Sequence, residues 1–337
     1  MSAISIDNEL IHYEVLGRGR PVILLHSWVG SWRYWVPTMQ NLQLKYRVYA
    51  VDLHGFGDTG KTGRKYSIDN QVDLLAAFMK AMAIPKAAII GHGLGAWVAM
   101  KFARLYPDQA PRIVLVSPPF FDMPGLNKRV RPGRMVAAPQ EKAISAEASI
   151  EATIMNSTMR AAMLERLRAS KGSDSGDDGL IPAELLQSAA QSSPRYNPLF
   201  SVLGRSTPED LLQRCVKRSS SLYEKLAVDL PKTDPDAIRV TASEYDCGRV
   251  LDDAWLLPML TLVIHGQDDD LIEPPSEAVW DYITYQKEDA LLPIPLPGVG
   301  HFPMLEYERF NRLVTDFLEA ADLSTLEIKE QWKRRSR

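Results

Sequence analysis

The stretch Gly91-His92-Gly93-Leu94-Gly95 is the first segment whose residue types and spacing point to chemistry. It connects an apolar run that predicts a strand to a helical pattern, and turns of this kind often hold a nucleophile in α/β enzymes. Nucleophilic catalysis needs an oxygen, sulfur or carboxylate on the attacking side chain. The central residue, Gly93, has no side chain, so the sequence leaves open whether the chain is an enzyme.

Polar residues also stand at the ends of other predicted strands. Residues 26–28 (His-Ser-Trp) follow the second predicted strand, Asp52 ends the third, and Asp269 and His301 follow the last two. In open α/β sheets, ligands and catalytic groups collect at the carboxyl ends of the strands. We therefore expect these side chains to meet the glycine-rich turn at one edge of a sheet.

The elements that must hold these residues alternate between short β-branched runs and helical patterns. Strands are predicted at 10–15, 21–26, 46–52, 87–92 and 112–117, with helices at 68–82 and 94–105. The pattern returns with strands at 261–266 and 291–296 and helices at 276–285 and 307–319. This alternation predicts an α/β fold with a mostly parallel central sheet flanked by helices.

Between residues 121 and 250 the strand signal disappears, and amphipathic helical patterns replace it. Residues 141–169 keep a helical period, and Thr207-Pro208-Glu209-Asp210 has the composition of a helix N-terminus. The sequence therefore predicts a helical cap inserted after the strand that ends near Ser117. The predicted division is a first core part at 1–120, the cap at 121–250, a second core part at 251–320 and a basic C-terminal tail at 321–337.

The order of these segments resembles that of the α/β-hydrolase superfamily over residues 4–319. Members of that family carry a His-Gly oxyanion loop, a D-x-x-G-x-G turn, a G-x-S-x-G elbow, an acid after the next-to-last strand and G-x-x-H before the last helix. The corresponding segments here are VILLHSWVG, VDLHGFGDTG, GHGLG, IHGQDDD and GVGH. The resemblance implies the α/β-hydrolase fold, with substrate specificity set by the cap.

The resemblance also implies roles for individual residues. Asp269 corresponds to the acid that orients the histidine, with Asp268 and Asp270 beside it as less certain alternatives, and His301 corresponds to the general base. The backbone amides of residues 28 and 94, Trp28 and Leu94, correspond to the oxyanion hole.

Three further residues are candidates for the lining of a pocket. Ser27 takes the place of the family's usual glycine in the oxyanion loop, and Phe302 follows the base. His92 is also close in sequence, but we expect a packed core histidine whose side chain points away from the site. The aromatic and methionine residues nearby favour a small, largely apolar molecule as ligand or substrate.

Glycine at residue 93 is the large departure from the family pattern, because a haloalkane dehalogenase or epoxide hydrolase of this fold would have aspartate there. An elbow imposes positive φ, which costs about 1–3 kcal/mol with a Cβ and far less for glycine. We favour a pseudoenzyme that binds a small apolar molecule or a protein. The alternatives are a hydrolase or lyase that uses His301 as general base on water or substrate, and a serine ester hydrolase inactivated at residue 93. We expect Gly93→Ser to gain activity, because the other parts of the site are in place.

Composition and motifs weigh against several other classes. The net charge of −3 gives no electrostatic footprint for nucleic acid. Two cysteines, and histidines without metal-ligand spacing, predict neither a disulfide framework nor a metal. Gly91, Gly93 and Ala96 match a dinucleotide fingerprint, but no acid ends the next strand, so no cofactor is expected. No run of roughly eighteen apolar residues occurs, which predicts a cytoplasmic protein without a membrane span. Assembly into a homo-oligomer stays open.

Overall fold

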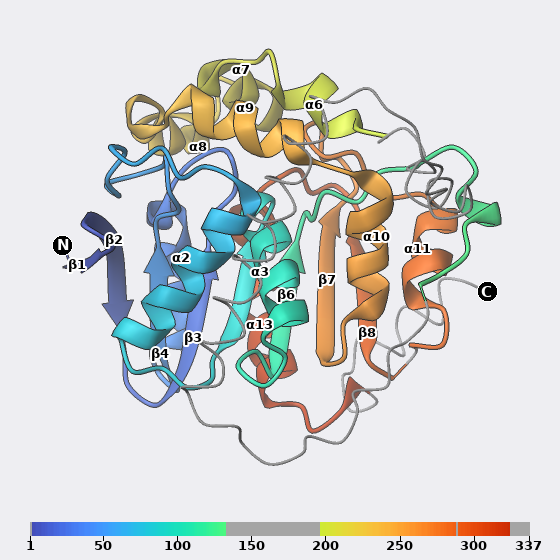
Figure 1. Ribbon diagram of the computed structural model, residues 1–337, viewed down its shortest axis with the longest axis horizontal. Coiled ribbons are helices and arrows are strands. Elements are labelled where there is room, and N and C mark those ends of the chain that lie inside the picture. The colour runs from blue at the N-terminus through green and yellow to red at the C-terminus, as the bar shows by residue number, and fades with distance from the viewer. Residues whose placement is uncertain (1, 133–195, 288, 324–337) are drawn as a thin grey trace, which may run out of the picture. The chain divides into compact units, whose positions relative to one another are not determined.

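The central element of the fold is one eight-stranded sheet (Figure 1). The computed structural model describes residues 2–132, 196–287 and 289–323, so the helix expected at 141–169 and most of the C-terminal tail lie outside the described residues. The strands are β1 (Ser2–Ile6), β2 (Glu9–Leu16), β3 (Arg20–Leu25), β4 (Tyr46–Val51), β5 (Ala88–His92), β6 (Arg112–Val116), β7 (Leu260–Gly266) and β8 (Leu291–Leu296). Their order is β1-β2-β4-β3-β5-β6-β7-β8, and adjacent strands from β4 across to β8 are parallel. The predicted α/β fold with a mostly parallel sheet is confirmed.

Strand β1 is the strand of this sheet that the sequence pattern does not indicate. It pairs antiparallel with β2 at the edge of the sheet, and its residues alternate between half-buried and exposed. Asp7 and Asn8, both at positive φ, make the turn between the two strands, as tight hairpins require. A short edge strand with one half-buried face has no continuous apolar run, which is why the pattern misses it.

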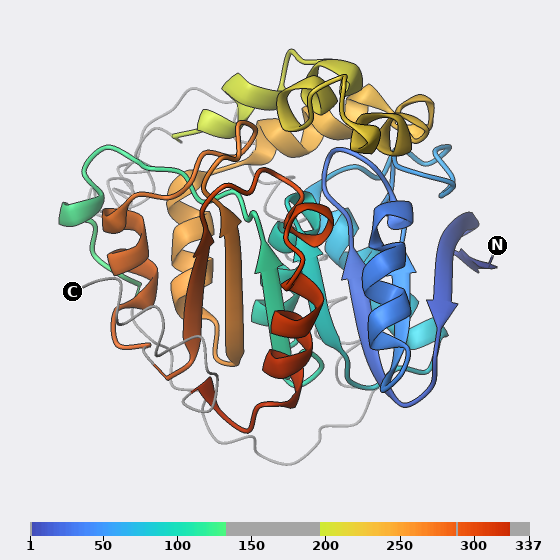
Figure 2. The ribbon, with the colours of Figure 1, turned by 180° about the vertical axis from the view of Figure 1, so that it is seen from behind.

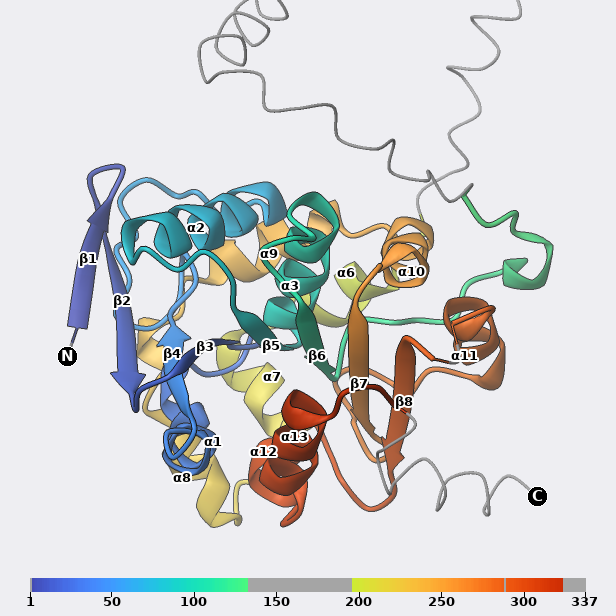
Figure 3. The ribbon, with the colours of Figure 1, turned by 90° about the horizontal axis from the view of Figure 1, so that it is seen from below.

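Helices lie on both faces of the sheet and across its carboxyl edge. They are the 3₁₀ turns η1 (Trp32–Trp35), η2 (Leu126–Lys128) and η3 (Leu230–Lys232), and the α-helices α1 (Val36–Leu42), α2 (Ile68–Ala81), α3 (Leu94–Leu105), α6 (Pro198–Leu203), α7 (Pro208–Cys215), α8 (Ser221–Ala227), α9 (Pro235–Glu244), α10 (Cys247–Leu256), α11 (Glu277–Thr284), α12 (Pro303–Glu306) and α13 (Phe310–Glu319). Helices α2, α3 and α10 lie on one face (Figure 3), and α1 and α13 lie on the other, which faces the viewer in Figure 2. Among the described residues, no helix is long and apolar enough to cross a membrane.

The parallel strands in the middle of the sheet determine where the site loops begin. Strands β3, β5, β6 and β7 are buried along nearly their whole length because helices pack on both faces. Strand β3 pairs with β5 in a register that places Leu25 opposite Gly91. The loop after β3 therefore starts level with the turn after β5, although the two are far apart in the sequence.

Helices α6 to α9 lie across the carboxyl edge of the sheet, at the top of Figure 1. Helix α9 contacts the loop after β3 through Thr241, and the amide of Asp234, just before α9, donates to Gly55 O at 2.7 Å. The N-terminus predicted at Thr207 is confirmed: its hydroxyl and Asp210 form a capping box, with Pro208 in the first turn. The division of the chain into core and cap stays a prediction, because residues 133–195 are outside the described ranges.

Candidate active site

Four loops at the carboxyl edge of the sheet bring the predicted site residues together. Ser27 follows β3, Gly93 joins β5 to α3, Asp269 follows β7, and His301 lies between β8 and α12. The side chains of Ser27, Asp269 and His301 are at most 3% exposed. The fold thus gathers residues from both halves of the sequence into one buried site.

A row of hydrogen bonds joins Ser27, His301 and Asp269. Ser27 Oγ lies 3.0 Å from His301 Nε2, and His301 Nδ1 lies 2.9 Å from Asp269 Oδ2. An ionised carboxylate only accepts, so the ring proton of neutral His301 is on Nδ1, and Nε2 accepts the proton of the Ser27 hydroxyl. Hydroxyl, imidazole and carboxylate therefore stand in the order of a serine–histidine–aspartate triad.

The carboxylate in this row belongs to Asp269, while the flanking Asp268 and Asp270 are exposed. Its second oxygen, Oδ1, accepts two backbone amides, each at 2.9 Å. Burial alone would raise the pKa of Asp269, but the bonded His301 and the backbone amides hold this pKa well below its usual range. Asp269 is therefore an ionised acceptor that fixes one orientation of the His301 ring.

Ser27 fills the space that a side chain at residue 93 would need. Gly93 has a φ of +52°, and a Cβ placed there would lie 2.1 Å from Ser27 Oγ and 2.9 Å from Ser27 Cβ. Both distances are shorter than Cβ contacts in real proteins, so a larger residue at this position would displace Ser27. The structure therefore argues against the expectation that Gly93→Ser alone gains activity, because the new side chain would push the Ser27 hydroxyl away from His301.

The amides expected to form an oxyanion hole lie in the same two loops. Trp28 follows Ser27, and Leu94 is the first residue of α3, where the amides of a helix have no intrahelical acceptor. Neither amide donates a hydrogen bond within the described part of the chain. The Trp28 side chain is fixed because its indole Nε1 donates to Thr241 Oγ1 at 3.0 Å. Both amides remain available for a developing negative charge, and their role as an oxyanion hole stays a prediction.

His26 holds the backbone of the Ser27 loop. Its Nε2 accepts the amide of Leu53 at 2.9 Å, and its Nδ1 lies 2.7 Å from Ser27 O. The amide can only donate and the carbonyl can only accept, so the ring is neutral with its proton on Nδ1. Burial lowers the pKa of His26, although the nearby Asp52 opposes this change. A neutral ring bonded at both nitrogens thus fixes the position of Ser27.

The structure corrects the expected direction of His92. The residue is fully buried, as expected of a core histidine, but its ring lies against that of His301 with centroids 4.4 Å apart. His92 Nε2 lies 2.7 Å from His301 O, and Nδ1 lies 2.9 Å from the Tyr34 hydroxyl. The side chain therefore contacts the site instead of pointing away from it.

Phe302 is also fully buried beside His301. Its ring packs edge-on against Tyr34 and His92, with centroids 5.4 and 5.3 Å apart. These contacts belong to the aromatic core behind the site. A place for Phe302 in the lining of a pocket stays a prediction.

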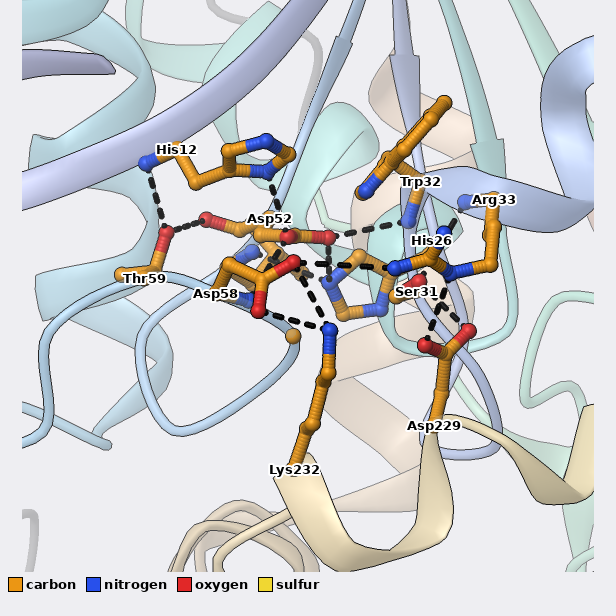
Figure 4. A network of polar contacts seen from close by, with 12 residues as sticks. His12, His26, Ser31, Trp32, Arg33, Asp52, Asp58, Thr59, Asp229 and Lys232 are labelled. Carbon is orange, nitrogen blue, oxygen red and sulfur yellow. Dashed lines mark hydrogen bonds and ion pairs between the residues drawn. The ribbon is translucent and has the colours of Figure 1, made fainter. Parts of the chain in front are cut away.

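A second polar group surrounds Asp52, which ends the third predicted strand (Figure 4). Asp52 is fully buried. Its Oδ2 lies 2.8 Å from His12 Nδ1 and accepts a hydrogen bond from the amide of Asp58 at 3.0 Å. Its Oδ1 accepts a hydrogen bond from the amide of Trp32 at 2.9 Å. Burial alone would lower the pKa of His12, but the bonded Asp52 raises it overall. The predicted aspartate therefore organises the loops after β3 and β4 and does not join the row of Ser27, His301 and Asp269.

Ion pairs extend this group to the segment between α8 and α9. Lys232 Nζ lies 2.7 and 3.0 Å from the two carboxylate oxygens of Asp58. Arg33 Nε and Ser31 Oγ donate to Asp229 at 3.2 and 2.6 Å. We call the six charged or titratable side chains of this group the charged cluster: His12, Arg33, Asp52, Asp58, Asp229 and Lys232.

Three side chains of the charged cluster have the spacing of a metal site. The ligand atoms of His12, Asp52 and Asp58 lie within 4.8 Å of one another. The ammonium group of Lys232 already contacts both oxygens of Asp58, and both oxygens of Asp52 accept hydrogen bonds. Because the cluster has its own cation and donors, we propose no metal there.

The sequence pattern did not identify Ser27 as the hydroxyl partner of His301. The signal is an exchange of residue types: the family's glycine in the oxyanion loop is serine here, and the family's elbow serine is glycine. Only the register of β3 and β5 places Ser27 beside Gly93. The sequence pattern does not indicate the contact of Tyr34 with His92 either, because nothing in its sequence position distinguishes it from a core tyrosine.

Comparisons with known sequences agree with the fold. Residues 20–162 match a family model described as the alpha/beta hydrolase fold. The chain is 32% identical over 107 residues to the pimeloyl-[acyl-carrier protein] methyl ester esterase of Aliivibrio salmonicida, which covers 32% of this chain and 39% of that protein. It is 29% identical over 112 residues to epoxide hydrolase 4 of Homo sapiens, covering 32% of this chain and 31% of that protein. The chain therefore matches less than half the length of these curated relatives.

Solved structures match over almost the whole chain. The meta-cleavage product hydrolase from Pseudomonas fluorescens IP01 aligns with 94% of this chain and 97% of its own, with a TM-score of 0.59 and 21% identity. At this identity the likeness shows the fold, and it confirms the fold that the sequence motifs predict.

Proposed function

We propose that this chain is a serine hydrolase of the α/β-hydrolase superfamily in which Ser27, and not a residue at the elbow, is the nucleophile. One observation carries this proposal: Ser27 Oγ lies 3.0 Å from His301 Nε2, in the space left by Gly93. The hydroxyl that the elbow lacks is thus supplied by the neighbouring loop.

The chemistry of acyl transfer then follows from the positions of the side chains. As Ser27 Oγ attacks the carbonyl carbon of an ester, His301 Nε2 takes the hydroxyl proton, and Asp269 stabilises the resulting imidazolium. The negative charge on the carbonyl oxygen is bound by the amides of Trp28 and Leu94. When the intermediate collapses, the alcohol leaves with the proton from His301. Water, activated by the same histidine, then hydrolyses the acyl group from Ser27 and releases the acid.

The surroundings of the hydroxyl favour a small ester as substrate. Trp28 and Leu94, which follow Ser27 and Gly93 in the sequence, are fully buried apolar residues. Among the relatives, one is named as a methyl ester esterase and another as an epoxide hydrolase. Glycine at residue 93 offers no carboxylate for attack on an epoxide, so we propose acyl transfer.

Three other hypotheses compete with this one. In the first, the protein is a non-catalytic binder of a small apolar molecule or a protein. In the second, it is a hydrolase or lyase that uses His301 as general base on water or substrate, and in the third it is a serine hydrolase inactivated at residue 93. None of the three explains why Ser27 Oγ lies at the position that a Cβ at residue 93 would approach and at hydrogen-bond distance from His301. The hydrolase names of the relatives support catalysis over binding alone.

Steady-state hydrolysis of short-chain p-nitrophenyl esters tests the proposal. We expect turnover by the protein as it stands and a loss of kcat of about 10³-fold or more in Ser27→Ala and in His301→Ala, because removal of one triad member disables the whole unit. Ser31→Ala is the matched control: Ser31 is a buried serine on the same loop, bonded to Asp229 and not to His301. It should keep most of its activity.

Equal turnover by Ser27→Ala and the unchanged protein would contradict the proposal. Activity that depends on His301 but not on Ser27 would support the general-base alternative. No turnover by the unchanged protein on any ester of the panel would support the binding hypothesis.

A further inference from the structure

Two buried side chains connect the loop of the proposed nucleophile to the loop of the base. The backbone amide of Ser27 donates to the Tyr34 hydroxyl at 2.7 Å, and that hydroxyl lies 2.9 Å from His92 Nδ1. The other ring nitrogen, His92 Nε2, lies 2.7 Å from His301 O. We call Tyr34 and His92 the neutral bridge.

With a neutral His92, one arrangement of protons satisfies this bridge. His301 O can only accept, so His92 Nε2 carries a proton. The Ser27 amide can only donate, so the Tyr34 oxygen accepts it and the Tyr34 hydroxyl proton is directed to His92 Nδ1. A neutral His92 makes both of its hydrogen bonds in this arrangement, whereas a protonated ring would turn a second donor toward the Tyr34 hydroxyl.

Packing around the bridge keeps it dry. Tyr34 is 5% exposed and His92 is fully buried, and both rings contact Trp35 and Phe302 edge-on or at a tilt. Burial, together with the nearby His301, lowers the pKa of His92 well below its usual value. Burial also raises the pKa of Tyr34 well above its usual value. Because both residues are buried, removing one partner leaves the others unsatisfied.

We propose that Tyr34 and His92 are positioning residues: through the Ser27 amide and the His301 carbonyl, they hold Ser27 Oγ and His301 Nε2 at hydrogen-bond distance. The inference rests on the proposed roles of Ser27 and His301. The relative position of the two loops then depends on a neutral histidine at residue 92, the residue before Gly93 in the elbow. A neutral ring here also leaves His301, 4.4 Å away, able to take a proton without repulsion from a second charge.

Kinetics of Tyr34→Phe and His92→Phe test the bridge, because both variants keep an aromatic ring of similar size. We expect kcat for p-nitrophenyl esters to fall about 10- to 100-fold, with KM changed by less than about threefold, since a displacement of about 1 Å between reacting groups costs this much. His92→Gln keeps one donor and one acceptor, so it should recover part of the loss seen in His92→Phe.

Tyr245→Phe is the matched control. Tyr245 is another fully buried tyrosine whose hydroxyl donates to a backbone carbonyl, Pro119 O, at 2.6 Å, and it touches neither Ser27 nor His301. We expect its kcat to stay within about threefold of the unchanged protein. An equal loss of kcat in Tyr245→Phe and Tyr34→Phe would overturn the positioning role, because the effect would then be a general cost of a buried hydroxyl.

Nitrogen-15 NMR of the histidine side chains gives a readout that does not depend on turnover. The His92 signals, identified by their loss in His92→Gln, should show a proton on Nε2, none on Nδ1, and no titration between about pH 6 and 8. A proton on Nδ1, or a charged ring in that range, would overturn the bridge. If instead the NMR result holds while Ser27→Ala keeps full activity, the proposed function fails and the bridge is left as a structural link without a catalytic role.

Discussion

The loop at residues 26–35 contacts two polar regions of opposite character. On one side, Ser27 and Tyr34 belong to a region in which His301 is bonded to Ser27 and to the charged acceptor Asp269. In the same region, His92 is bonded to the Tyr34 hydroxyl and to His301 O. On the other side, Arg33 joins the charged cluster, where acids and bases pair directly (Figure 4). The loop thus places the Ser27 hydroxyl beside a neutral His92 and is itself held by ion pairs; we call the first of these two regions the neutral region because its histidine His92 is uncharged.

The polar groups of the two regions can do different things: those of one can react with a substrate, and those of the other hold the loop in place. In the charged cluster, each carboxylate already has donors or a cation, so none is left to act on a substrate. In the region of His301, Nε2 has one partner, the Ser27 hydroxyl, whose proton it can take. We infer that the charged cluster fixes the loop while the neutral region carries the chemistry.

The largest expected effect on kcat comes from moving the hydroxyl from Ser27 back to residue 93. Ser27→Gly alone should lose kcat by about 10³-fold or more, and Gly93→Ser alone should lose activity because its Cβ displaces Ser27. The double variant Ser27→Gly/Gly93→Ser removes that collision and places a hydroxyl near His301, so it should exceed Ser27→Gly in ester hydrolysis. Strongly non-additive rates in this double-mutant cycle would confirm that the two positions share one space. Additive losses would contradict it.

Breaking the charged cluster should change stability more than rate. Asp52→Asn removes a fully buried charge from His12 and turns an amide donor toward the Trp32 and Asp58 amides, so we expect a loss of about 3–5 kcal/mol in the free energy of unfolding. Urea unfolding measures this loss. Lys232→Met, which removes a partly exposed partner, should cost about 1 kcal/mol or less after screening by solvent.

In both variants kcat for esters, measured under conditions where the protein is folded, should stay within about tenfold of the unchanged value. A loss of kcat in Asp52→Asn as large as that in Ser27→Ala would place Asp52 in the catalytic unit and end the distinction between the two regions.

The pH dependence of the free energy of unfolding should also distinguish the two regions, with a smaller effect than the substitutions. Burial lowers the pKa of His26 and His92, so their stabilising contribution is present above the unfolded value of about 6.5 and is lost as the pH falls. Each such histidine contributes a slope of up to about 1.4 kcal/mol per pH unit. His12, whose pKa is raised by Asp52 against the effect of burial, has the opposite sign: its contribution is present at low pH and is lost as the pH rises.

Urea unfolding at about pH 7.5, 6.5 and 5.5 measures the net effect, which should be a lower free energy of unfolding at acid pH. In His92→Gln the decrease in the free energy of unfolding between about pH 7.5 and 5.5 should be smaller, because the contribution of His92 is gone. Stability that rises on acidification would mean that the charged cluster, and not the neutral region, dominates the titration.

The sequence alone predicted the sheet, the flanking helices, and the Asp269–His301 pair, because parallel strands and their loops leave local apolar patterns and a fixed motif order. It predicted Gly93 as a missing nucleophile and could not place a substitute, since the contact with Ser27 depends on the register of β3 and β5. The direction of His92 was also beyond local pattern, because its two partners, Tyr34 and His301, come from other loops. Contacts between loops decide this site, and single-sequence patterns do not encode them.

Covalent labelling tests the central claim most directly. The protein, in a preparation that turns over a p-nitrophenyl ester, is treated with a fluorophosphonate inhibitor, and peptide mass spectrometry locates the adduct. We predict a single adduct on Ser27 that forms in parallel with the loss of activity, is absent from Ser27→Ala, and forms far more slowly in His301→Ala. Loss of activity with the adduct on any other residue, or retention of ester turnover after Ser27 is fully labelled, would contradict the claim that Ser27 is the nucleophile.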